Sequence, residues 1–364
     1  MAPPTETAVL AEVAPQPAND LRNISIARRE APAQFGGRSA GVSNEEHAPD
    51  SASGFLGQSE IAILDTLRTQ AIRHARKGSG GRTLAFKLEL ADGTRAYFKP
   101  EQQVSSAHWY AEVAAYYLDR ALGLGRVPPV VSRRVRWDQL QSAAEGDRRV
   151  PEVKVSADGS VRGALIYWLP KHLVAAETPP GWENWLRIKP FARWAVSPYQ
   201  ASTSYGAALA HAHDQIARGQ PGDAYYDDVP LPARPELPAE LSDMIVFDFL
   251  TLNYDRWGGD NTNVLTLGVA GPLIFLDNGD GFSVGPARRG LLDARLAPLQ
   301  RFRKRTVEAL KALDVRALGE RMAHDALAPI LDAHMLEGLE LRRRALLEHV
   351  VEQVRRFGDA VYAW

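Results

Sequence analysis

Apolar side chains recur at roughly helical spacing in three parts of the chain. Residues 60–76 and 106–122 each carry one apolar stripe, which predicts two helices in the first third of the sequence. From residue 296 to the end, leucines and other apolar residues recur in the same way and predict a helical C-terminal region. By contrast, residues 1–55 are rich in Ala, Pro, Ser, Asn and charge without a sustained period, so we expect a disordered tail there.

Two β-rich runs lie between the predicted helices. Residues 83–90 and 95–99 flank an Asp92-Gly93 step, which is a strong short-range hairpin signal. Pro100 has no N–H with which to continue a strand ladder. We therefore expect Lys99 to project from the end of the second strand.

The stretch from residue 243 to residue 282 organises the functional prediction. An apolar run at 245–252 leads into four polar or aromatic residues, 253–256, and two short apolar runs then flank residues 268–272. This pattern predicts a helix, a loop and a hairpin.

The hairpin predicts a cluster of oxygen-bearing side chains. A five-residue loop would place Asn263 opposite Asp277, with Cβ atoms about 5 Å apart, and the preceding loop would deliver Asp255 to the same end. An Asp and an Asn that hold Mg²⁺ or Mn²⁺ against nucleotide phosphates, with a separate Asp near the attacking hydroxyl, are typical of kinase-type phosphoryl transfer. The alternative is that these Asp and Asn residues are ordinary turn formers.

Composition and charge limit the class of protein. Of the 364 residues, 45% are hydrophobic and 8% aromatic, which is typical of a globular protein that can bury a core. The 43 basic and 44 acidic residues nearly cancel, so no global charge favours a nucleic-acid or membrane partner. The absence of cysteine excludes disulfides, thiol nucleophiles and zinc–thiolate sites.

The N-terminal residues lead to an expectation about location. They lack a basic segment followed by a compact apolar core, and no run of about 18 apolar residues occurs in the sequence. We therefore expect a cytoplasmic protein, with a separate secretion route left open.

Two further signals are weaker. The glycine-rich turn of residues 77–81 could cover phosphates with its backbone amides, with Gly80 as its candidate residue, although a flexible turn is the simpler interpretation. Residues 222–228 form a loop long enough to contact a substrate.

Several of these motifs resemble one known family, the four-jointed and Golgi casein kinase family of atypical secretory-pathway kinases. The resemblance is carried by Phe247-Asp-Phe-Leu, Asn253-Tyr-Asp255-Arg256 and Leu276-Asp277-Asn-Gly-Asp-Gly-Phe282. It extends to Phe98-Lys99-Pro100 and to the helical segment Ala111-Glu112-Val-Ala-Ala-Tyr-Tyr-Leu. The animal relatives carry disulfides, so the absence of cysteine is a departure.

The resemblance implies a role for each matched residue. Lys99 would bind the nucleotide phosphates, and Glu112 would pair with Lys99 directly or through the phosphate and metal shell. Asp255 would be the catalytic residue and Asp277 a metal ligand. Asn263 or Asn261 would complete the metal site. Kinase-like folds often place this Asn five residues after the catalytic Asp, so the Asp at position 260 of this chain is a departure from the pattern, and the predicted hairpin register favours Asn263.

We therefore predict an α+β, two-lobed atypical protein-kinase-like fold, with a small antiparallel-sheet N-lobe over 56–165 and a mostly helical C-lobe over 166–364. The predicted function is that of an ATP-dependent phosphotransferase that uses Mn²⁺ or Mg²⁺. A protein Ser/Thr kinase of the four-jointed and Golgi casein kinase type is the favoured prediction. The acceptor would be a protein or a glycan, and the sequence makes no prediction of oligomeric state. The alternatives are a kinase for a sugar or small-molecule hydroxyl, a pseudokinase scaffold, and a metal-dependent hydrolase, which would leave Lys99 and Glu112 without a role.

Overall fold

The computed structural model describes residues 54–79, 81–103, 107–188, 218, 230–257, 261, 263–283 and 289–364. Chain contacts divide the protein into two units, residues 1–49 and 50–364, and every described residue belongs to the second. The predicted tail and the loop at 222–228 therefore lie outside the described residues, except for the last two tail positions. Phe55, one of these two, is buried.

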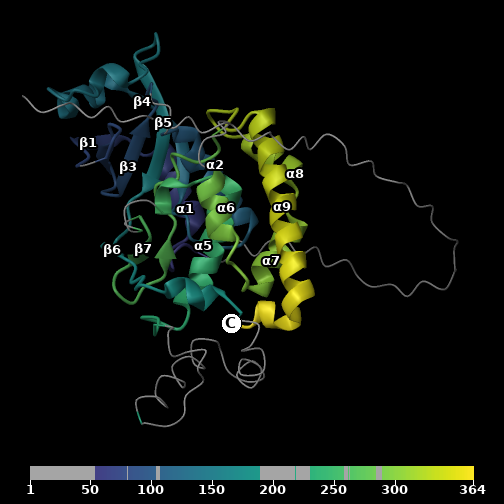
Figure 1. The fold of residues 1–364 in the computed structure, drawn as a ribbon. Coiled ribbons are helices and arrows are strands. Elements are labelled where there is room, and N and C mark those ends of the chain that lie inside the picture. The colour runs from purple at the N-terminus through teal and green to yellow at the C-terminus, as the bar shows by residue number, and fades with distance from the viewer. Residues whose placement is uncertain are drawn as a thin grey trace, which may run out of the picture. The chain divides into compact units, whose positions relative to one another are not determined.

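An antiparallel five-stranded sheet forms the N-terminal part of this unit (Figure 1). Its strand order is β1-β2-β3-β5-β4. The strands are β1 (Ile72–Lys77), β2 (Phe86–Leu90), β3 (Arg95–Pro100), β4 (Val130–Arg136) and β5 (Ser160–Tyr167). The predicted hairpin is confirmed, because β2 and β3 pair in register from Phe86↔Phe98 to Glu89↔Arg95.

Two helices pack on this sheet, α1 (Glu60–Thr69) and α2 (Trp109–Ala121). The first helix is shorter than expected, since the structure ends it at Thr69 and makes Ile72–Lys77 a strand. Arg133 of β4 donates to the carbonyl oxygens of Leu67 (2.8 Å) and Gln70 (2.6 Å), at the end of the helix. Long-range pairing with β2 thus overrides the helical spacing of residues 70–76, and the prediction for that segment is wrong.

Short elements connect the sheet to the second half of the unit. Three 3-10 turns lie between β4 and β5, and a fourth lies near the end of the described segment 107–188. They are Trp137–Gln139, Gln141–Ala144, Val150–Glu152 and Trp182–Leu186. A three-stranded sheet with order β6-β7-β8 lies beyond the five-stranded one and consists of β6 (Leu173–Ala175), β7 (Leu265–Leu267) and β8 (Leu273–Ile274).

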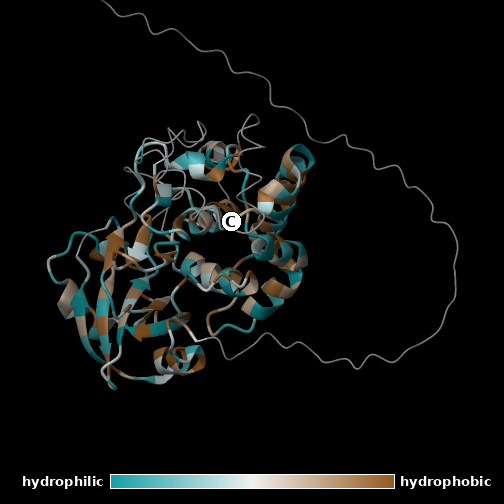
Figure 2. Cartoon of the chain, turned by 90° about the horizontal axis from the view of Figure 1, so that it is seen from below, coloured by the Kyte–Doolittle hydropathy of each residue, from teal (hydrophilic) through white to brown (hydrophobic). Residues whose placement is uncertain are grey.

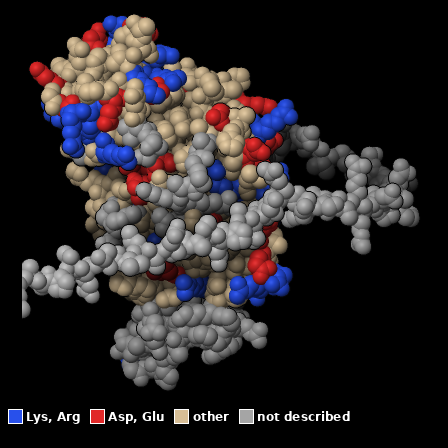
Figure 3. Space-filling view, turned by 45° about the horizontal axis from the view of Figure 1, so that its top comes forward, with Lys and Arg blue, Asp and Glu red and all other residues tan. Residues whose placement is uncertain are grey.

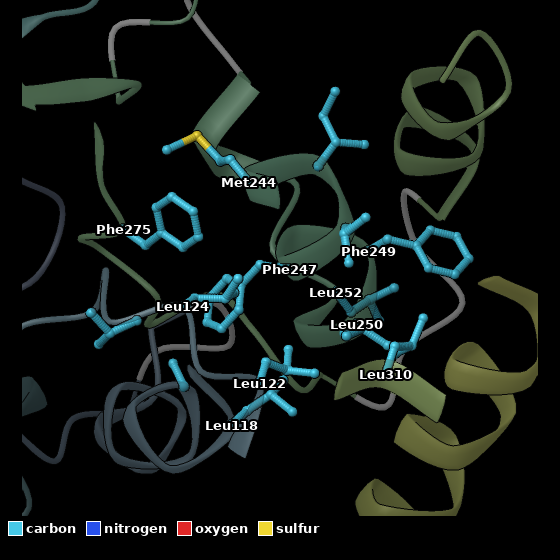
Figure 4. Close-up of a cluster of buried hydrophobic side chains, with 14 of the residues drawn as sticks. Leu118, Leu122, Leu124, Met244, Phe247, Phe249, Leu250, Leu252, Phe275 and Leu310 are labelled. Carbon is cyan, nitrogen blue, oxygen red and sulfur yellow. The ribbon is translucent and has the colours of Figure 1, made fainter. Parts of the chain in front are cut away.

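The C-terminal part is mostly helical. Its described helices are α5 (Leu237–Thr251), α6 (Arg289–Leu296), α7 (Lys304–Ala312), α8 (Val315–Met322) and α9 (Ala333–Phe357), with 3-10 turns at Asp255–Trp257 and Gly358–Tyr362. All fifteen residues of α5 are buried, which explains why its apolar run shows little periodicity. Figure 4 shows side chains of α2, α5 and α7 meeting around Phe247 and Phe275 in the core.

The surface helices are two-sided. In Figure 2 they carry hydrophobic residues along one side and hydrophilic residues along the other, as helices packed on a core do. Acidic and basic side chains both occur on the face drawn in Figure 3. None of the described helices combines the length and apolar character that crossing a bilayer requires. The predicted α+β class, with an antiparallel-sheet N-terminal part and a helical C-terminal part, is confirmed.

Candidate active site

A cavity of about 850 Å³ lies between the five-stranded sheet and the loops that follow α5. Its walls include strand residues of β3, the connection from β5 to β6, the turn at residues 81–83 and the two loops around Asp255 and Asp277. Four of the predicted site residues line it, namely Lys99, Asp255, Asn263 and Asp277. The fold therefore brings together residues from positions 99 to 277 of the chain.

Lys99 lies near the end of β3, where the strand meets β5. The pairing of Lys99 with Ala164 and of Pro100 with Gly163 fixes its register. Only glycine fits at position 163, because the two strands approach closely and a Cβ atom there would lie 2.4 Å from the Lys99 carbonyl oxygen. The backbone of the lysine is thus held tightly, while its side chain enters the cavity.

The Lys99 ammonium group contacts two carboxylates. Its Nζ atom lies 2.5 Å from Oε1 of Glu112 and 2.5 Å from Oδ1 of Asp277. Burial alone would lower the pKa of Lys99, but Asp277 and Glu112 together raise it above its ordinary value, so the lysine stays charged. The expected ion pair between Lys99 and Glu112 is present.

Glu112 comes from the first turns of α2 and is 1% exposed. The start of this helix is tied to the opposite side of the site, because the His108 N–H donates to the Gly279 carbonyl at 2.6 Å. The α2 helix thus bridges the sheet and the loop that carries Asp277. This connection explains how a residue at position 112 can face one at position 277.

The backbone at Asp277 adopts a left-handed conformation, with φ of 57°. Its carbonyl accepts a hydrogen bond from Asn253 Nδ2 at 3.1 Å, and its carboxylate faces Lys99 with the side chain 60% exposed. The positive charge of Lys99 lowers the pKa of Asp277. Asp277 is therefore an ionised, accessible carboxylate at the cavity wall.

Asp255 begins the 3-10 turn that follows α5 and is exposed. Asn263 Nδ2 donates to the Asp255 carbonyl at 3.4 Å, so the two residues lie next to one another. Asn261 has a left-handed backbone, with φ of 63°, and accepts a hydrogen bond from the Val264 N–H at its carbonyl. It does not line the cavity, whereas Asn263 does. Gly80 lies outside the described residues.

The predicted register of the hairpin is wrong by one residue. Leu265 pairs with Ile274 and Thr266 with Leu273, and the Leu267 N–H donates to the Pro272 carbonyl at 3.0 Å. The loop therefore has four residues rather than five, because Pro272 takes part in the pairing through its carbonyl. A shift of one residue changes the face of every side chain. Asn263 reaches the cavity through its contact with Asp255, not by opposing Asp277 across the hairpin.

The donors at this wall fit a nucleotide-bound cation. Asp277 and Asn263 offer oxygen atoms, which Mg²⁺ and Mn²⁺ prefer, and Asp277 is ionised. Over the described ranges, no three His, Asp or Glu side chains form a metal-ligand group. A cation held here would thus take its remaining ligands from phosphate oxygens and water, as is usual for Mg²⁺ in nucleotide sites.

One buried residue that the sequence left without a role connects the two loops. Arg256 is 1% exposed, and its Nε atom lies 2.9 Å from both carboxylate oxygens of Asp248 in α5. Its Nη2 atom donates to Asn278 Oδ1 at 2.7 Å. Arg256 thereby fixes the loop of Asp255 against the loop of Asp277. The sequence held one signal for this pair, namely an aspartate, Asp248, inside the apolar run of α5, because a buried carboxylate needs a partner.

Two further residues hold the turn at 81–83. Arg149 Nη1 donates to the carbonyl oxygens of Gly81 and Thr83, both at 2.9 Å. Gln102 is 6% exposed and exchanges hydrogen bonds with the Leu84 N–H (2.8 Å) and carbonyl (2.9 Å). Nothing in the sequence identified either residue, because both contacts span 18 or more positions.

Comparisons with known proteins identify the family of the chain. The family described as Golgi casein kinase, C-terminal, Fam20 matches residues 57–147 and 227–360. The human extracellular serine/threonine protein kinase FAM20C is 27% identical in an alignment of 347 positions that covers 82% of this chain and 54% of that protein. Human glycosaminoglycan xylosylkinase is 28% identical in an alignment of 338 positions that covers 82% of this chain and 76% of that protein. The chain thus spans about half the length of the first relative.

A solved structure shares the fold. The crystal structure of the Golgi casein kinase with Mn/ADP bound superimposes with a TM-score of 0.53 and 18% sequence identity, over 83% of this chain and 78% of that one. The resemblance to the four-jointed and Golgi casein kinase family is therefore confirmed.

The cytoplasmic location expected from the sequence is wrong. The relatives include a kinase named as extracellular and another named for the Golgi, which conflicts with a cytoplasmic assignment. The expectation rested on the composition of the N-terminal residues alone, and residues 1–53 lie outside the part of the chain that the structure describes.

Proposed function

The chain belongs to the Fam20-type Golgi casein kinase family, and on this basis we propose that it is an ATP-dependent kinase that phosphorylates an alcohol group. The observation that carries the proposal is the contact of Lys99 with both Glu112 and Asp277 at the wall of a cavity that also exposes Asp255. A metal-dependent hydrolase would have no use for the lysine–glutamate pair. Catalysis of phosphoryl transfer, by contrast, is mostly positioning and charge neutralisation.

Lys99 would bind the phosphates of ATP, with Glu112 holding its ammonium group in place. The turn at 81–83 would cover the same phosphates, since it lines the cavity beside Lys99. Asp277 and Asn263 would hold Mn²⁺ or Mg²⁺, which would neutralise phosphate charge when bound. Asn261 is the weaker candidate because it does not line the cavity.

Asp255 would orient the acceptor hydroxyl and accept its proton. In the transfer, the acceptor oxygen forms a bond to the γ-phosphorus while the bond from that phosphorus to the β–γ bridging oxygen breaks, and ADP leaves. The hydroxyl proton passes to a carboxylate oxygen of Asp255. The exposure of this carboxylate at the cavity wall supports the role, since an acceptor can reach it.

We also propose lobe boundaries at 56–165 and 166–364, preceded by a tail over 1–55. The boundary at 165/166 falls two residues before the end of β5 at Tyr167, after which the chain passes along the cavity as Trp168, Leu169 and Pro170. Segments that connect two lobes beside a ligand cavity are the usual place for domain closure.

The proposed acceptor is a Ser or Thr hydroxyl of a protein, and a sugar hydroxyl is the second candidate. The second candidate is favoured by one observation, namely that the xylosylkinase is as similar to this chain as the protein kinase is, at 28% against 27% identity.

One experiment tests both the transfer and the acceptor. The full chain is incubated with labelled ATP and either Mn²⁺ or Mg²⁺, and phosphate is sought by mass spectrometry on the protein itself, on casein-like peptides and on xylose-containing glycans. We expect transfer to at least one hydroxyl acceptor. ATP binding without transfer to any acceptor would favour the pseudokinase alternative, and no binding of ATP with either metal would refute the proposal.

A further inference from the structure

A short segment that leads into α1 contacts three separate parts of the fold. We call residues 55–60 the strap, and its last residue, Glu60, is the first residue of α1. Phe55 is 4% exposed and packs in one cluster with Leu169, Leu267 and Ile274, which belong to the interlobe connection and the small sheet. The Tyr167 hydroxyl donates to Gln58 Oε1 at 3.1 Å. The strap therefore follows the end of β5 and the beginning of the connection to β6.

The strap also forms hydrogen bonds with α2, the helix that carries Glu112. Glu60 Oε1 accepts a hydrogen bond from Arg120 Nε at 2.7 Å and another from the Tyr116 hydroxyl. The Arg120 guanidinium lies over the Tyr116 ring at 4.5 Å and over the Phe55 ring at 5.7 Å. Charge-assisted hydrogen bonds of this kind are about twice as strong as neutral ones.

Tyr116 and Arg120, which contact Glu60, lie on the same side of α2 as Glu112. Glu112, Tyr116 and Arg120 follow one another at intervals of four residues, so they lie along one side of the helix. A rotation of α2 about its axis would therefore move Glu112 away from Lys99 and break both contacts to Glu60. The contact of Glu112 with Lys99 and the contacts of α2 with Glu60 therefore depend on the same rotation of the helix.

The helix into which the strap leads, α1, is held at both ends. Ser59 accepts a hydrogen bond from the Ala62 N–H and caps α1, and Arg133 of β4 holds the other end of that helix. The C-terminal end of α2 has contacts of its own, because Asp119 accepts from the N–H groups of Arg126 and Val127. The strap contacts α2 at Tyr116, in the middle of the helix, and at Arg120, in its last turn.

We propose that Glu60 is a positioning residue that sets the rotation of α2 and thereby places Glu112 against Lys99. This inference rests on the proposed kinase function. Glu60 touches neither Lys99 nor the cavity wall in the described structure, and it acts through Tyr116 and Arg120.

The test uses the full chain with three single variants. Glu60→Ala removes the acceptor, Glu60→Gln keeps an acceptor without the charge, and Asp65→Ala is the matched control, since Asp65 is an exposed acid on the same helix. We expect kcat/KM for ATP to fall about tenfold in Glu60→Ala and about threefold in Glu60→Gln, and to change less than twofold in Asp65→Ala. The melting temperature records whether each variant is folded.

A double variant separates positioning from a general loss of structure. Because Glu60 acts through Glu112, adding Glu60→Ala to Glu112→Gln should cause no loss beyond that of Glu112→Gln alone. Losses that multiply, or a Glu60→Ala variant indistinguishable from Asp65→Ala, would overturn the inference. If Glu60→Ala does not fold, Tyr116→Phe removes a single hydroxyl and should show about a threefold loss with the same non-additivity.

The positioning role of Glu60 can still be tested if the chain is not a kinase. Should the wild type bind ATP with Mn²⁺ but transfer no phosphate, the kinase proposal is refuted. Thermal-shift titration of the same variants with ATP and Mn²⁺ then tests the inference by itself, because placement of Lys99 affects nucleotide binding as well as transfer. Equal affinities in the wild type, Glu60→Ala and Tyr116→Phe would overturn it.

Discussion

Lys99 Nζ lies 2.5 Å from Asp277 Oδ1, although the two residues are 178 positions apart in the chain. This contact joins the sheet to the loop after β8 and keeps Asp277 ionised, since the ammonium group lowers the pKa of the carboxylate. In the proposed complex with ATP, the phosphates and a divalent cation would enter between these two groups. The direct contact would then be exchanged for contacts through the nucleotide.

The first prediction separates Asp277 from Asp255. Asp277→Ala should weaken ATP binding in the presence of Mn²⁺ or Mg²⁺ and abolish transfer, because it removes the proposed metal ligand. Asp255→Ala should lower turnover by about 10² to 10⁴-fold, the usual contribution of a positioned acid–base group, with ATP affinity within a few-fold of wild type. Thermal-shift titration with ATP and metal, beside a transfer assay, measures both effects. Equal loss of affinity in the two variants would make Asp255 a second ligand instead.

The second prediction concerns the buried pair of Asp248 and Arg256. Both side chains are fully buried, so Arg256→Ala leaves an unpaired carboxylate in the core and should lower the free energy of unfolding by about 3–5 kcal/mol. The single ammonium group of a lysine cannot contact Asp248 and also reach Asn278 as the Nε and Nη2 atoms of Arg256 do, so Arg256→Lys should recover only part of this loss. Urea unfolding measures the difference.

A matched control for this pair is available in α8. Arg316 also contacts an acid, Glu320, at 3.1 Å, but the two side chains are 89% and 64% exposed. Arg316→Ala should change the free energy of unfolding by less than about 0.5 kcal/mol. A loss in Arg256→Ala no larger than that of the control would contradict the structural role assigned to Arg256.

Local signals in the sequence were enough for the elements that carry the site, but not for how they meet. Asp92-Gly93 predicted the β2–β3 hairpin, and the polar residues after the apolar run placed Asp255 just beyond α5. The Lys99–Glu112 pair came from family resemblance, because nothing in the spacing of the two residues relates them. The individual roles of Lys99, Glu112, Asp255, Asp277 and the two asparagines stay predictions.

The errors have physical causes in long-range contacts. Residues 70–76 have helical spacing, yet pairing with β2 makes Ile72–Lys77 a strand. The predicted five-residue loop included Pro272, but the carbonyl of Pro272 accepts from the Leu267 N–H, which shortens the loop by one residue. Arg149 and Gln102 could not be identified, because each stabilises a turn that lies far away in the chain.

The third prediction is a pH effect at Asp243 in α5. Burial raises the pKa of this carboxyl to about 6, although Arg303, at 3.2 Å, opposes the shift. An unfolded Asp titrates near 3.9. Between about pH 4 and pH 6 the native state therefore holds more protons than the unfolded state, and the contribution of Asp243 to the free energy of unfolding falls as the pH rises through this range.

The variant Asp243→Asn isolates this contribution, since the amide oxygen can still accept the hydrogen bond from Thr306. The wild type should gain stability relative to Asp243→Asn as the pH is lowered from 7 to 4. Urea midpoints of both proteins across this range give the difference. A difference that is constant with pH, or that grows in the opposite direction, would show that Asp243 does not titrate in this way.

The fourth prediction concerns Arg149 and the turn at 81–83. The guanidinium group is held by Asp147 at 2.8–2.9 Å and donates to the carbonyl oxygens of Gly81 and Thr83. These contacts fix the shape of the turn, which lines the cavity beside the proposed phosphate site. Arg149→Ala should therefore weaken ATP binding about fivefold to tenfold, which corresponds to about 1–1.4 kcal/mol, while turnover at saturating ATP stays within twofold.

Arg148→Ala provides the comparison, since Arg148 is the exposed neighbour of Arg149 and carries the same charge. If only the net charge near the cavity matters, the two variants should lose ATP affinity equally, because each removes one positive charge from the same edge. If the shape of the turn matters, Arg149→Lys should behave like Arg149→Ala, since an ammonium group cannot contact both carbonyl oxygens and Asp147 in the planar geometry of arginine. The contacts observed here favour the second outcome, and titration of the three variants with ATP and Mn²⁺ distinguishes them.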